Sequence, residues 1–351
     1  MKGRHIVLGH LFGAEAAALL IDGQLHDLIA DPTPVAALAP GAILRGKVER
    51  LMKGQGGVFV RLPDGLRGWL RDRAGVGEGQ TVIVQVTGVA EEGKAIPVSN
   101  RLLLKGRFGI VTPGAPGVNV SRRLRDPDLR DRLTALGESV LAGRSHGLIL
   151  RSACDDADGA DVHDDIAPLA DLADQLLADR DGPPELLLDA SSPWEQAWME
   201  WNDPPPDQLD EGDDTFEVHG VLDAVDALLR AEILLPGGAT AMIEPTRALV
   251  AVDVNTGADT SPAAALKANI ALARDLPRQL RLRGLGGQVV VDFAPMPKRD
   301  RAVLDQVLRA AFKGESAETV LSGWTAMGLF EVNRKRDRLP LSRLAAAARG
   351  A

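Results

Sequence analysis

The chain has 351 residues, of which 45% are hydrophobic, and a formal net charge of −9 at pH 7. These values predict a globular protein of two or three domains, and they exclude wholesale disorder and an evenly basic surface that coats nucleic acid. The one cysteine, Cys154, excludes an intrachain disulfide and a zinc site built on paired cysteines. No apolar run approaches the roughly 20 residues of a membrane span and no signal-peptide pattern is found, so we expect a cytoplasmic protein.

Short strand patterns fill the first hundred residues. They fall at residues 4–8, 16–21, 24–29, 43–51, 58–62, 66–70, 81–86 and 95–99. A tight hairpin is predicted at Asp22-Gly23, and prolines between residues 32 and 40 mark a linker. The last five strand patterns, separated by glycine turns, are typical of an OB-type barrel, whose surface commonly binds single-stranded nucleic acid.

Phe59 and Trp69 are the large aromatic residues of this predicted barrel, and Lys94 adds positive charge to it. Aromatic side chains in short strands most often fill a core, so from the pattern we favour a place inside the barrel. The alternative, in which both rings stack on the bases of a bound single strand, stays open.

The middle of the chain is a mixed region. We expect strands at 106–111, 147–151 and 183–188, helices at 129–136 and 167–177, a loop at 112–119 and an exposed linker at 202–214. Ser121-Arg122-Arg123 is a basic cluster, and the acidic residues between 155 and 165 predict a solvated loop or helix start rather than a calcium loop. Trp194, Trp198 and Trp201 follow helical spacing, which favours a helix face packed on a core over a stacking platform.

Residues 246–293 predict a strand, a helix capped by Ser261, and a second strand, with an acid near the end of each strand. The acids are Asp253 and Asp292, and Asn255 lies two residues past the first. Because the carboxyl ends of parallel strands meet at one edge of a sheet, these side chains predict a site for a hard divalent cation. A helix at 299–312, strands at 318–321 and 328–332, a basic cluster at 333–336 and a loosely ordered tail at 344–351 are expected to follow.

These motifs resemble the ribonuclease E/G family. The resemblance is carried by VAVDVNTG at 250–257 and RQLRLRGLGGQVVVDF at 278–293, with weaker matches at 41–51, 120–124, 147–152 and 234–250. It implies a multidomain α/β (α+β) fold, in which an RNase H-like subdomain is split around an inserted OB-type barrel and a 5′-sensor region and is followed by a DNase I-like catalytic subdomain. The expected boundaries are 1–40 and 182–235 for the RNase H-like parts, 41–100 for the barrel, 101–181 for the sensor and 236–351 for the catalytic part.

The resemblance also implies roles for individual residues. Asp253 and Asp292 would ligate Mg²⁺, with Mn²⁺ as an alternative, and Asn255 would orient the scissile phosphate or its water. The candidate RNA-binding residues are Phe59, Trp69, Lys94, Arg122, Arg123, Arg281 and Arg283. The candidate 5′-phosphate-binding residues are Gly106, Ile110, Arg151 and Ser152.

The resemblance therefore implies a Mg²⁺-dependent endoribonuclease that hydrolyses single-stranded RNA, such as rRNA precursors or mRNA, to 5′-phosphate and 3′-hydroxyl ends during RNA processing or decay. One alternative is a non-catalytic RNA-binding protein with a lapsed nuclease domain, and another is a metal-dependent phosphatase acting on small molecules. The family's cysteine-bearing zinc-link motif is missing, so we expect no zinc and no zinc-linked tetramer, with a homodimer as the assembly considered. The chain resembles a short, stand-alone member of the family.

Overall fold

The structure is a computed structural model that describes residues 2–49, 56–72, 75–90 and 93–350. The chain divides into two compact units, each formed from separate parts of the sequence. Unit 1 comprises residues 1–6 and 36–210, and unit 2 comprises residues 7–35 and 211–351. Among the described residues, no helix is long and apolar enough to cross a membrane.

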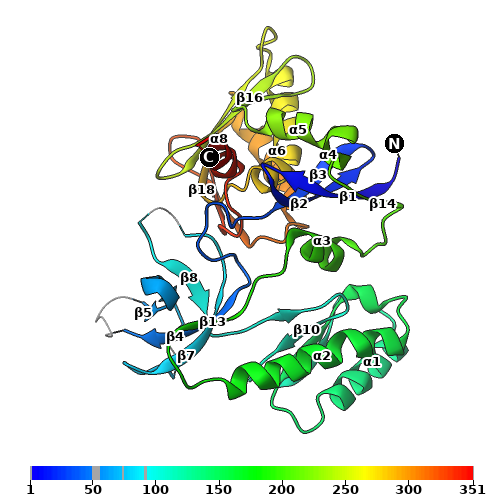
Figure 1. Ribbon diagram of the computed structural model, residues 1–351. Helices are drawn as coiled ribbons and strands as arrows, with labels where there is room; N and C mark the ends of the chain where they lie inside the picture. Colours follow the sequence, from blue (N-terminus) through cyan, green and yellow to red (C-terminus); the bar gives the residue numbers. More distant parts are fainter. Residues whose placement is uncertain (1, 50–55, 73–74, 91–92, 351) are drawn as a thin grey trace. The chain divides into compact units, whose positions relative to one another are not determined.

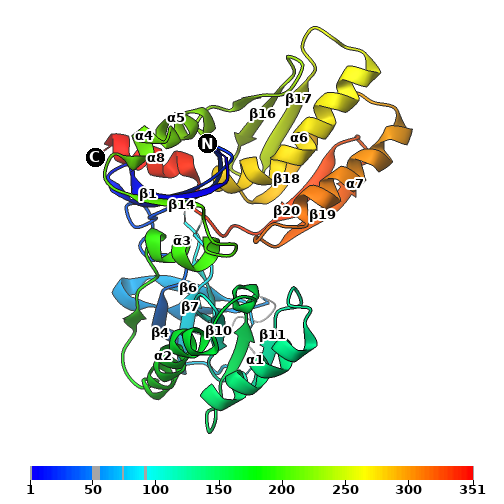
Figure 2. The same ribbon diagram turned by 90° about the vertical axis from the view of Figure 1, so that its right-hand side faces the viewer.

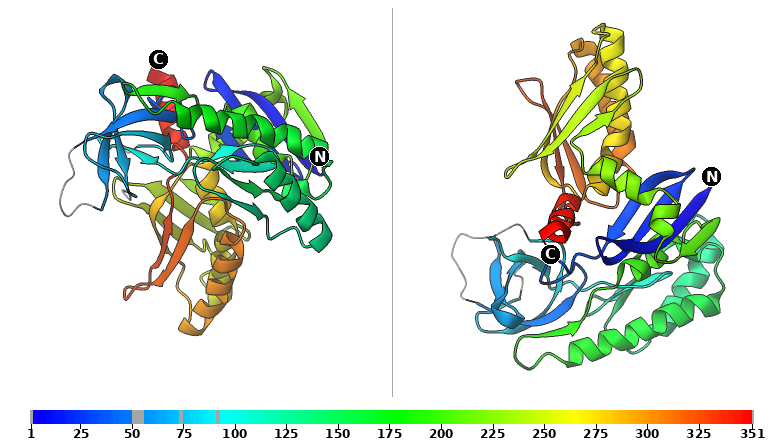
Figure 3. Two further views of the ribbon diagram at one scale, coloured as in Figure 1. Left: turned by 90° about the horizontal axis from the view of Figure 1, so that it is seen from below. Right: turned by 45° about the horizontal axis from the view of Figure 1, so that its top comes forward.

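Five strands of unit 1 close into a barrel, shown in blue to cyan in Figure 3. They are β4 (Ile43–Val48), β5 (Val58–Arg61), β6 (Arg67–Leu70), β7 (Thr81–Val86) and β8 (Ile96–Ser99), in the order β4-β5-β6-β8-β7 with β7 paired back to β4. Valines and leucines on alternate positions, such as Leu44, Val60 and Val84, fill the interior. The closed barrel agrees with the OB-type prediction, and the predicted strand at 43–51 ends among residues outside the described part.

A second sheet of unit 1 is covered by two helices that lie side by side in Figure 1. Its strand order is β11 (Gly117–Val120), β12 (Gly147–Leu150), β10 (Gly109–Thr112) and β9 (Leu104–Lys105), and its helices are α1 (Pro127–Val140) and α2 (Gly159–Ala178). The loop predicted at 112–119 is partly wrong, because residues 117–120 pair in parallel with β12. The acidic segment lies at the start of α2, where Asp158 accepts a hydrogen bond from the Ala160 N–H.

The remainder of unit 1 holds β13 (Glu185–Leu188), which pairs with β4, and α3 (Pro193–Trp201). A reciprocal capping box between Ser192 and Glu195 starts α3. Trp201 is 5% exposed but Trp198 is 49% exposed, so the prediction that the tryptophan face packs on a core is wrong for Trp198. The linker predicted at 202–214 contains a strand, β14 (Gln208–Glu211), which pairs with β1 (Arg4–Leu11); the division between the units passes through both strands.

Unit 2 begins with β1, β2 (Ala14–Ile21) and β3 (Gln24–Ala30), which are consecutive in one sheet. At the predicted hairpin, Asp22 and Gly23 have φ values of 50° and 78°, as the tightest hairpin turn requires. The core beside these strands includes residues of α4 (Thr215–Val218), α5 (Val221–Leu228) and α8 (Leu341–Gly350). The expectation of a loosely ordered tail is wrong for residues 344–350, because α8 buries Leu341 and Leu344.

The larger sheet of unit 2 has two long helices on one face, as Figure 2 shows. Its order is β15 (Glu232–Leu234), β16 (Thr240–Pro245), β17 (Val250–Asn255), β18 (Gly287–Asp292), β20 (Phe330–Arg334) and β19 (Thr319–Trp324), and the helices are α6 (Pro262–Leu282) and α7 (Arg301–Phe312). As predicted, Ser261 caps α6 through the Ala264 N–H. This helix is the crossover that parallel strands β17 and β18 need.

Candidate active site and nucleic-acid surface

Asp253 and Asp292 lie side by side on the open face of the unit 2 sheet. They are register partners on the parallel strands β17 and β18. Along each strand exposed and buried positions alternate, so that Val252, Val254 and Val291 face the helices. Since neighbouring strands are about 4.8 Å apart, both carboxylates can contact one small ligand on the exposed face.

Asn255 shares this exposed face with Asp253, two positions along the same strand. Its side-chain Nδ2 donates to Asp253 Oδ2 at 2.9 Å. This hydrogen bond holds the carboxylate in place and leaves its second oxygen for a ligand. The structure thus brings together all three residues that the sequence singled out.

A buried residue fixes the chain immediately after Asp292, and sequence reasoning missed it. Asn269 of α6 is 0% exposed. Its amide donates to the Ala294 carbonyl at 2.9 Å and accepts from the Ala294 N–H at 3.0 Å. The detectable signal was a carboxamide in the apolar stripe of an amphipathic helix, where a polar side chain needs a partner.

The two aspartates fit a hard divalent cation. Mg²⁺ is commonly bound by one or two carboxylates and keeps several waters, which a substrate phosphate can replace. Two exposed carboxylates on adjacent strands, one of them oriented by an amide, supply such a set of oxygen donors. The thiol of Cys154 offers no comparable ligand, because it is buried and burial raises its pKa to about 11.

Phe59 and Trp69 lie on the outer surface of the barrel, so the core-filling interpretation is wrong. They are cross-strand partners on β5 and β6, and their ring centroids are 4.9 Å apart. Their neighbours Val58 and Val60 point into the barrel instead. Arg67 stacks on Phe59 with its guanidinium carbon 4.2 Å from the ring centroid. Two half-buried rings and a cation on an outer sheet face suit a stacking surface for bases.

The predicted basic contacts Lys94, Arg122 and Arg123 are exposed in unit 1. Arg122 and Arg123 follow β11 at the end where its parallel partner β12 leads into Arg151. The Ser121 N–H donates to the Leu150 carbonyl at 2.8 Å and keeps the two segments together. Positive charge therefore gathers at this edge of the sheet.

Two of the predicted 5′-phosphate contacts, Arg151 and Ser152, lie at the same edge, where each bonds to a carboxylate. Arg151 donates through Nη1 to the Gly106 and Met199 carbonyls, at 2.9 and 3.0 Å, and through Nη2 to Glu200 Oε2 at 3.0 Å. Ser152 donates to Asp203 Oδ2 at 2.8 Å. Ile110 is half-buried in the middle of β10, opposite Ile149 rather than at the edge.

Arg281 and Arg283, predicted as RNA contacts, are instead buried inside unit 2, at 8% and 6% exposure. Arg283 donates to the Leu228 and Arg230 carbonyls, both at 2.6 Å, and burial lowers its pKa to about 10. Arg281 pairs with Glu315 and donates to the His26 carbonyl at 2.8 Å. Neither guanidinium faces solvent, so these contacts do not support a surface role.

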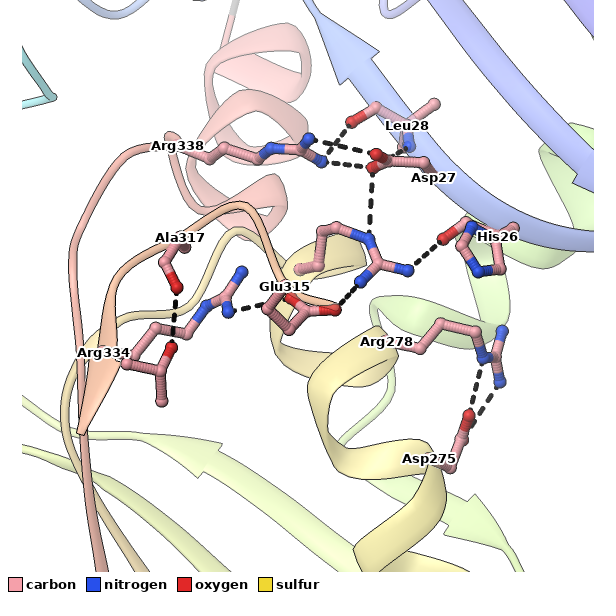
Figure 4. Close-up of polar contacts among 11 residues, drawn as sticks. His26, Asp27, Leu28, Asp275, Arg278, Glu315, Ala317, Arg334 and Arg338 are labelled. Atoms are coloured by element: carbon pink, nitrogen blue, oxygen red, sulfur yellow. Dashed lines mark hydrogen bonds and ion pairs between the residues drawn. The ribbon is translucent and has the colours of Figure 1, made fainter. Parts of the chain in front are cut away.

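An ion-pair network surrounds Arg281, and Figure 4 shows its labelled members. Arg338 pairs with Asp27, and Arg334 donates to Glu315 at 2.9 Å. Burial acts to raise the pKa of Asp27, but Arg338 and Arg281 outweigh it and hold the pKa below its ordinary value. Arg334 is 2% exposed, so the basic cluster predicted at 333–336 is partly an internal structural element.

Comparisons with known proteins found similar sequences. The sequence model of the ribonuclease E/G family matches residues 103–208 and 206–337, about two thirds of the chain. Over 378 aligned residues the chain is 26% identical to a ribonuclease E from Nostoc sp., covering 92% of this chain and 54% of that protein. It is 27% identical to a ribonuclease E from Synechocystis sp., covering 74% and 44%, and 26% identical to ribonuclease G from Escherichia coli, covering 75% and 61%. The chain thus spans about half the length of these curated relatives.

Proposed function

Because the chain belongs to the ribonuclease E/G family, we propose that it is a Mg²⁺-dependent endoribonuclease acting on single-stranded RNA in RNA processing or decay. The observation that carries the proposal is the pairing of Asp253 with Asp292 in register on the open face of a sheet, with Asn255 bonded to Asp253. In the same proposal, the sheet of β15–β20 is the DNase I-like catalytic part, and β1–β3 belong to the RNase H-like part.

Asp253 and Asp292 would hold the ion, which would polarise the scissile phosphate and lower the pKa of a bound water. Asn255 restrains Asp253 through the 2.9 Å hydrogen bond, so the ligand geometry is set before substrate arrives. Asn269 restrains the backbone at Ala294 and therefore the end of the strand that carries Asp292.

The proposed products follow from the bond that breaks. A water oxygen forms a bond to phosphorus, the bond from phosphorus to the 3′ oxygen breaks, and the 3′ oxygen takes up a proton. One fragment then ends in a 3′-hydroxyl and the other begins with a 5′-phosphate. Phe59 and Trp69 would stack on exposed bases, which single strands offer and duplexes do not.

The test is cleavage of a labelled single-stranded RNA with Mg²⁺ or with a chelator. Asp253→Asn and Asp292→Asn should each reduce cleavage by at least about 10²-fold, because charge neutralisation at the phosphate is lost. The RNA affinity and the melting temperature of both variants should equal those of the parent within experimental error, since both side chains are exposed. Asp226→Asn, which removes an exposed acid from α5, is the matched control and should cut like the parent.

Three results would contradict the assignment. Parental cleavage by either aspartate variant would show that the metal site is elsewhere, and equal cleavage in chelator would remove the metal requirement. RNA binding without cleavage under any divalent cation would favour the alternative of an RNA-binding protein with a lapsed nuclease domain.

A further inference from the structure

Unit 2 contains a cavity of about 260 Å³, lined by residues at the ends of α5, β16 and α6 and at the start of α8. Most of its lining residues are apolar, and Ile243 and Leu285 are examples from the core beneath it. The polar lining residues are Arg283, Glu244 and Ser342. An apolar cavity with a small number of polar groups is the usual form of a site for a small molecule.

Arg283 brings a buried positive charge to this cavity. The other buried arginines among the described residues, Arg45, Arg281 and Arg334, each pair with a carboxylate. The Nη1 and Nε atoms of Arg283 bond to neutral oxygens, and its Nη2 has no partner among the described residues. Burying a charge is costly unless the charge is paired, so this guanidinium lacks the partner that a buried cation normally has.

Two carboxylates act on Arg283 or line the same cavity, but neither forms an ion pair with it. Asp275 is bonded to Arg278 and Gln279. Burial outweighs Asp275 and lowers the pKa of Arg283 to about 10, so that the guanidinium is still charged at neutral pH. Glu244 lines the cavity from an exposed position, where water weakens its field. The buried part of the cavity therefore keeps an uncompensated positive charge.

The first turn of α8 adds further attraction for an anion. Leu341 and Ser342 begin this helix and line the cavity, and the N-terminus of a helix carries a partial positive charge. The Leu341 N–H donates to the Arg283 carbonyl at 3.1 Å, which fixes the start of α8 beside Arg283. The Ser342 hydroxyl makes no hydrogen bond to the part of the chain that the structure describes. It is a second donor for a ligand in the cavity.

Size and wall chemistry limit the kind of anion. A volume of about 260 Å³ has room for roughly eight waters, or for an organic molecule of about as many non-hydrogen atoms. A strongly hydrated anion such as phosphate would lose water to apolar walls that offer it few hydrogen bonds. A carboxylate attached to a hydrocarbon body would pair with Arg283 and bury its apolar part against those walls.

We propose that this cavity binds a small organic carboxylate with a branched hydrocarbon body, held through its carboxylate by Arg283. Asp253, Asn255 and Asp292 do not line the cavity, so the inference goes beyond the proposed function and does not depend on it. Contact with Nη2 requires a small shift of lining side chains, because this atom is closed to water in the structure. Side-chain adjustments of this kind are common on binding.

The test measures the affinity of the full chain for three probes by calorimetry at pH 7, in a buffer free of phosphate and of divalent cations. The probes are isovalerate, its neutral isostere isovaleramide, and inorganic phosphate. Isovalerate should bind at least about tenfold more tightly than isovaleramide, because only the carboxylate pairs with the guanidinium, and more tightly than phosphate, which has no hydrocarbon.

Two variants probe the cavity without removing a donor. Ala231→Leu places extra hydrocarbon in the cavity and should weaken isovalerate binding at least about tenfold, whereas Ala302→Leu adds the same group at an exposed position of α7 and should bind like the parent. Glu244→Gln removes the exposed like charge, so it should tighten isovalerate binding about twofold and leave isovaleramide binding unchanged.

A third variant probes the charge itself. Arg283→Met should bind isovalerate and isovaleramide equally, and Arg309→Met, which removes an exposed cation of α7, should keep the parental ratio. If Arg283→Met does not fold, Ala231→Leu and Glu244→Gln decide, since both keep every donor of the cavity.

The inference is overturned if the parent binds isovalerate and isovaleramide within twofold, binds phosphate more tightly than isovalerate, or binds none of the three probes. It is also overturned if Ala231→Leu binds isovalerate like the parent. Every readout is binding without divalent cations, so failure of the nuclease assignment leaves these outcomes unchanged.

Discussion

Arg283, at the C-terminal end of α6, is buried, although the sequence predicted that it would contact RNA at the surface. Arg283 follows Leu276 and Leu280 at helical spacing, so it belongs to the buried stripe of the helix. It is stabilised there by the carbonyls of Leu228 and Arg230, which lie more than fifty positions earlier in the chain. Arginine is usually exposed, and nothing within one helical turn indicates such acceptors, so the sequence could not place it inside.

The ion pair of Asp27 with Arg338 leads to a prediction about pH. Asp27→Asn should lower the free energy of unfolding at pH 7 by roughly 3 kcal/mol, because Arg338 loses its ion-pair partner and Arg281 keeps only Glu315 in a buried setting. The pKa of Asp27 is lowered in the folded state, so its contribution is present above the ordinary pKa and is lost as the pH falls through the lowered value. Urea unfolding should be measured at pH 7, 5 and 3. The difference in the free energy of unfolding between the parent and Asp27→Asn should be constant from pH 7 to pH 5 and smaller at pH 3.

The matched control is Asp72→Asn, which breaks an exposed pair with Arg101 in unit 1. Exposed ion pairs contribute at most about 1 kcal/mol to stability, so the free energy of unfolding of this variant should stay close to that of the parent at every pH. A difference for Asp27→Asn that grows on acidification would have the wrong sign and would contradict the assignment.

At the scale of elements, the barrel strands show what alternation does and does not indicate. The period of two in β5 predicts two faces but not which one points inward. The barrel interior takes the smaller Val58 and Val60, and Phe59 is left on the outer face with Trp69. Gly57 makes room for this arrangement, since a Cβ there would lie 2.7 Å from a ring carbon of Trp69. Barrel closure therefore decided the orientation of the aromatic pair.

The contact between α6 and the end of β18 leads to a prediction about positioning. Asn269→Leu should lower the free energy of unfolding by about 3 kcal/mol, because it leaves the buried N–H and carbonyl of Ala294 without partners. It should also weaken the activation of cleavage by Mg²⁺, since the end of the strand that carries Asp292 is no longer held. Urea unfolding and a Mg²⁺ titration of cleavage measure the two effects.

Two comparison variants on α6 complete the experiment. Asn269→Asp can accept from the Ala294 N–H but cannot donate to its carbonyl. Its free energy of unfolding and its response to Mg²⁺ should therefore lie between those of the parent and of Asn269→Leu. Lys267→Leu changes an exposed position of the helix and should behave like the parent. An unchanged Mg²⁺ requirement in Asn269→Leu at temperatures where it is fully folded would leave Asn269 a purely structural residue.

At the scale of the whole molecule, each apolar core belongs to one compact unit. The barrel core and the core under α1 and α2 are built from residues of the 36–210 segment, and the other two cores from residues of unit 2. The aromatic pair Phe59 and Trp69 lies in unit 1, and the aspartate pair lies in unit 2. In the proposed function, RNA binding and cleavage would therefore belong to different compact units.

This division predicts that residues 36–210 fold and bind single-stranded RNA without unit 2. The isolated segment should unfold cooperatively, because it contains two complete cores of its own. Trp69→Ala within it should weaken RNA binding by roughly tenfold, since stacking contributes about 1–3 kcal/mol per base. Circular dichroism and fluorescence anisotropy test this; an unfolded segment, or equal affinity after Trp69→Ala, would contradict the prediction.

The sequence by itself determined what depends on neighbours along the chain. Periodicity placed Asp253 and Asp292 on strands, Ser261 marked the start of α6, and Asp22-Gly23 marked a hairpin, because alternation, capping and turn geometry act over a few residues. The sequence also showed the resemblance to the family, through the motifs at 250–257 and 278–293.

Only the tertiary structure decided which charges meet. Glu200 lies 49 positions from Arg151, and Glu315 lies 34 positions from Arg281, yet each pair occupies an arginine that the sequence predicted as a phosphate or RNA contact. Ion pairs between distant segments leave no local period in the sequence, and their strength depends on burial that folding alone creates. The sequence therefore predicted that Asp253 and Asp292 lie next to each other, whereas the partners of Arg151 and Arg281 emerged only from the fold.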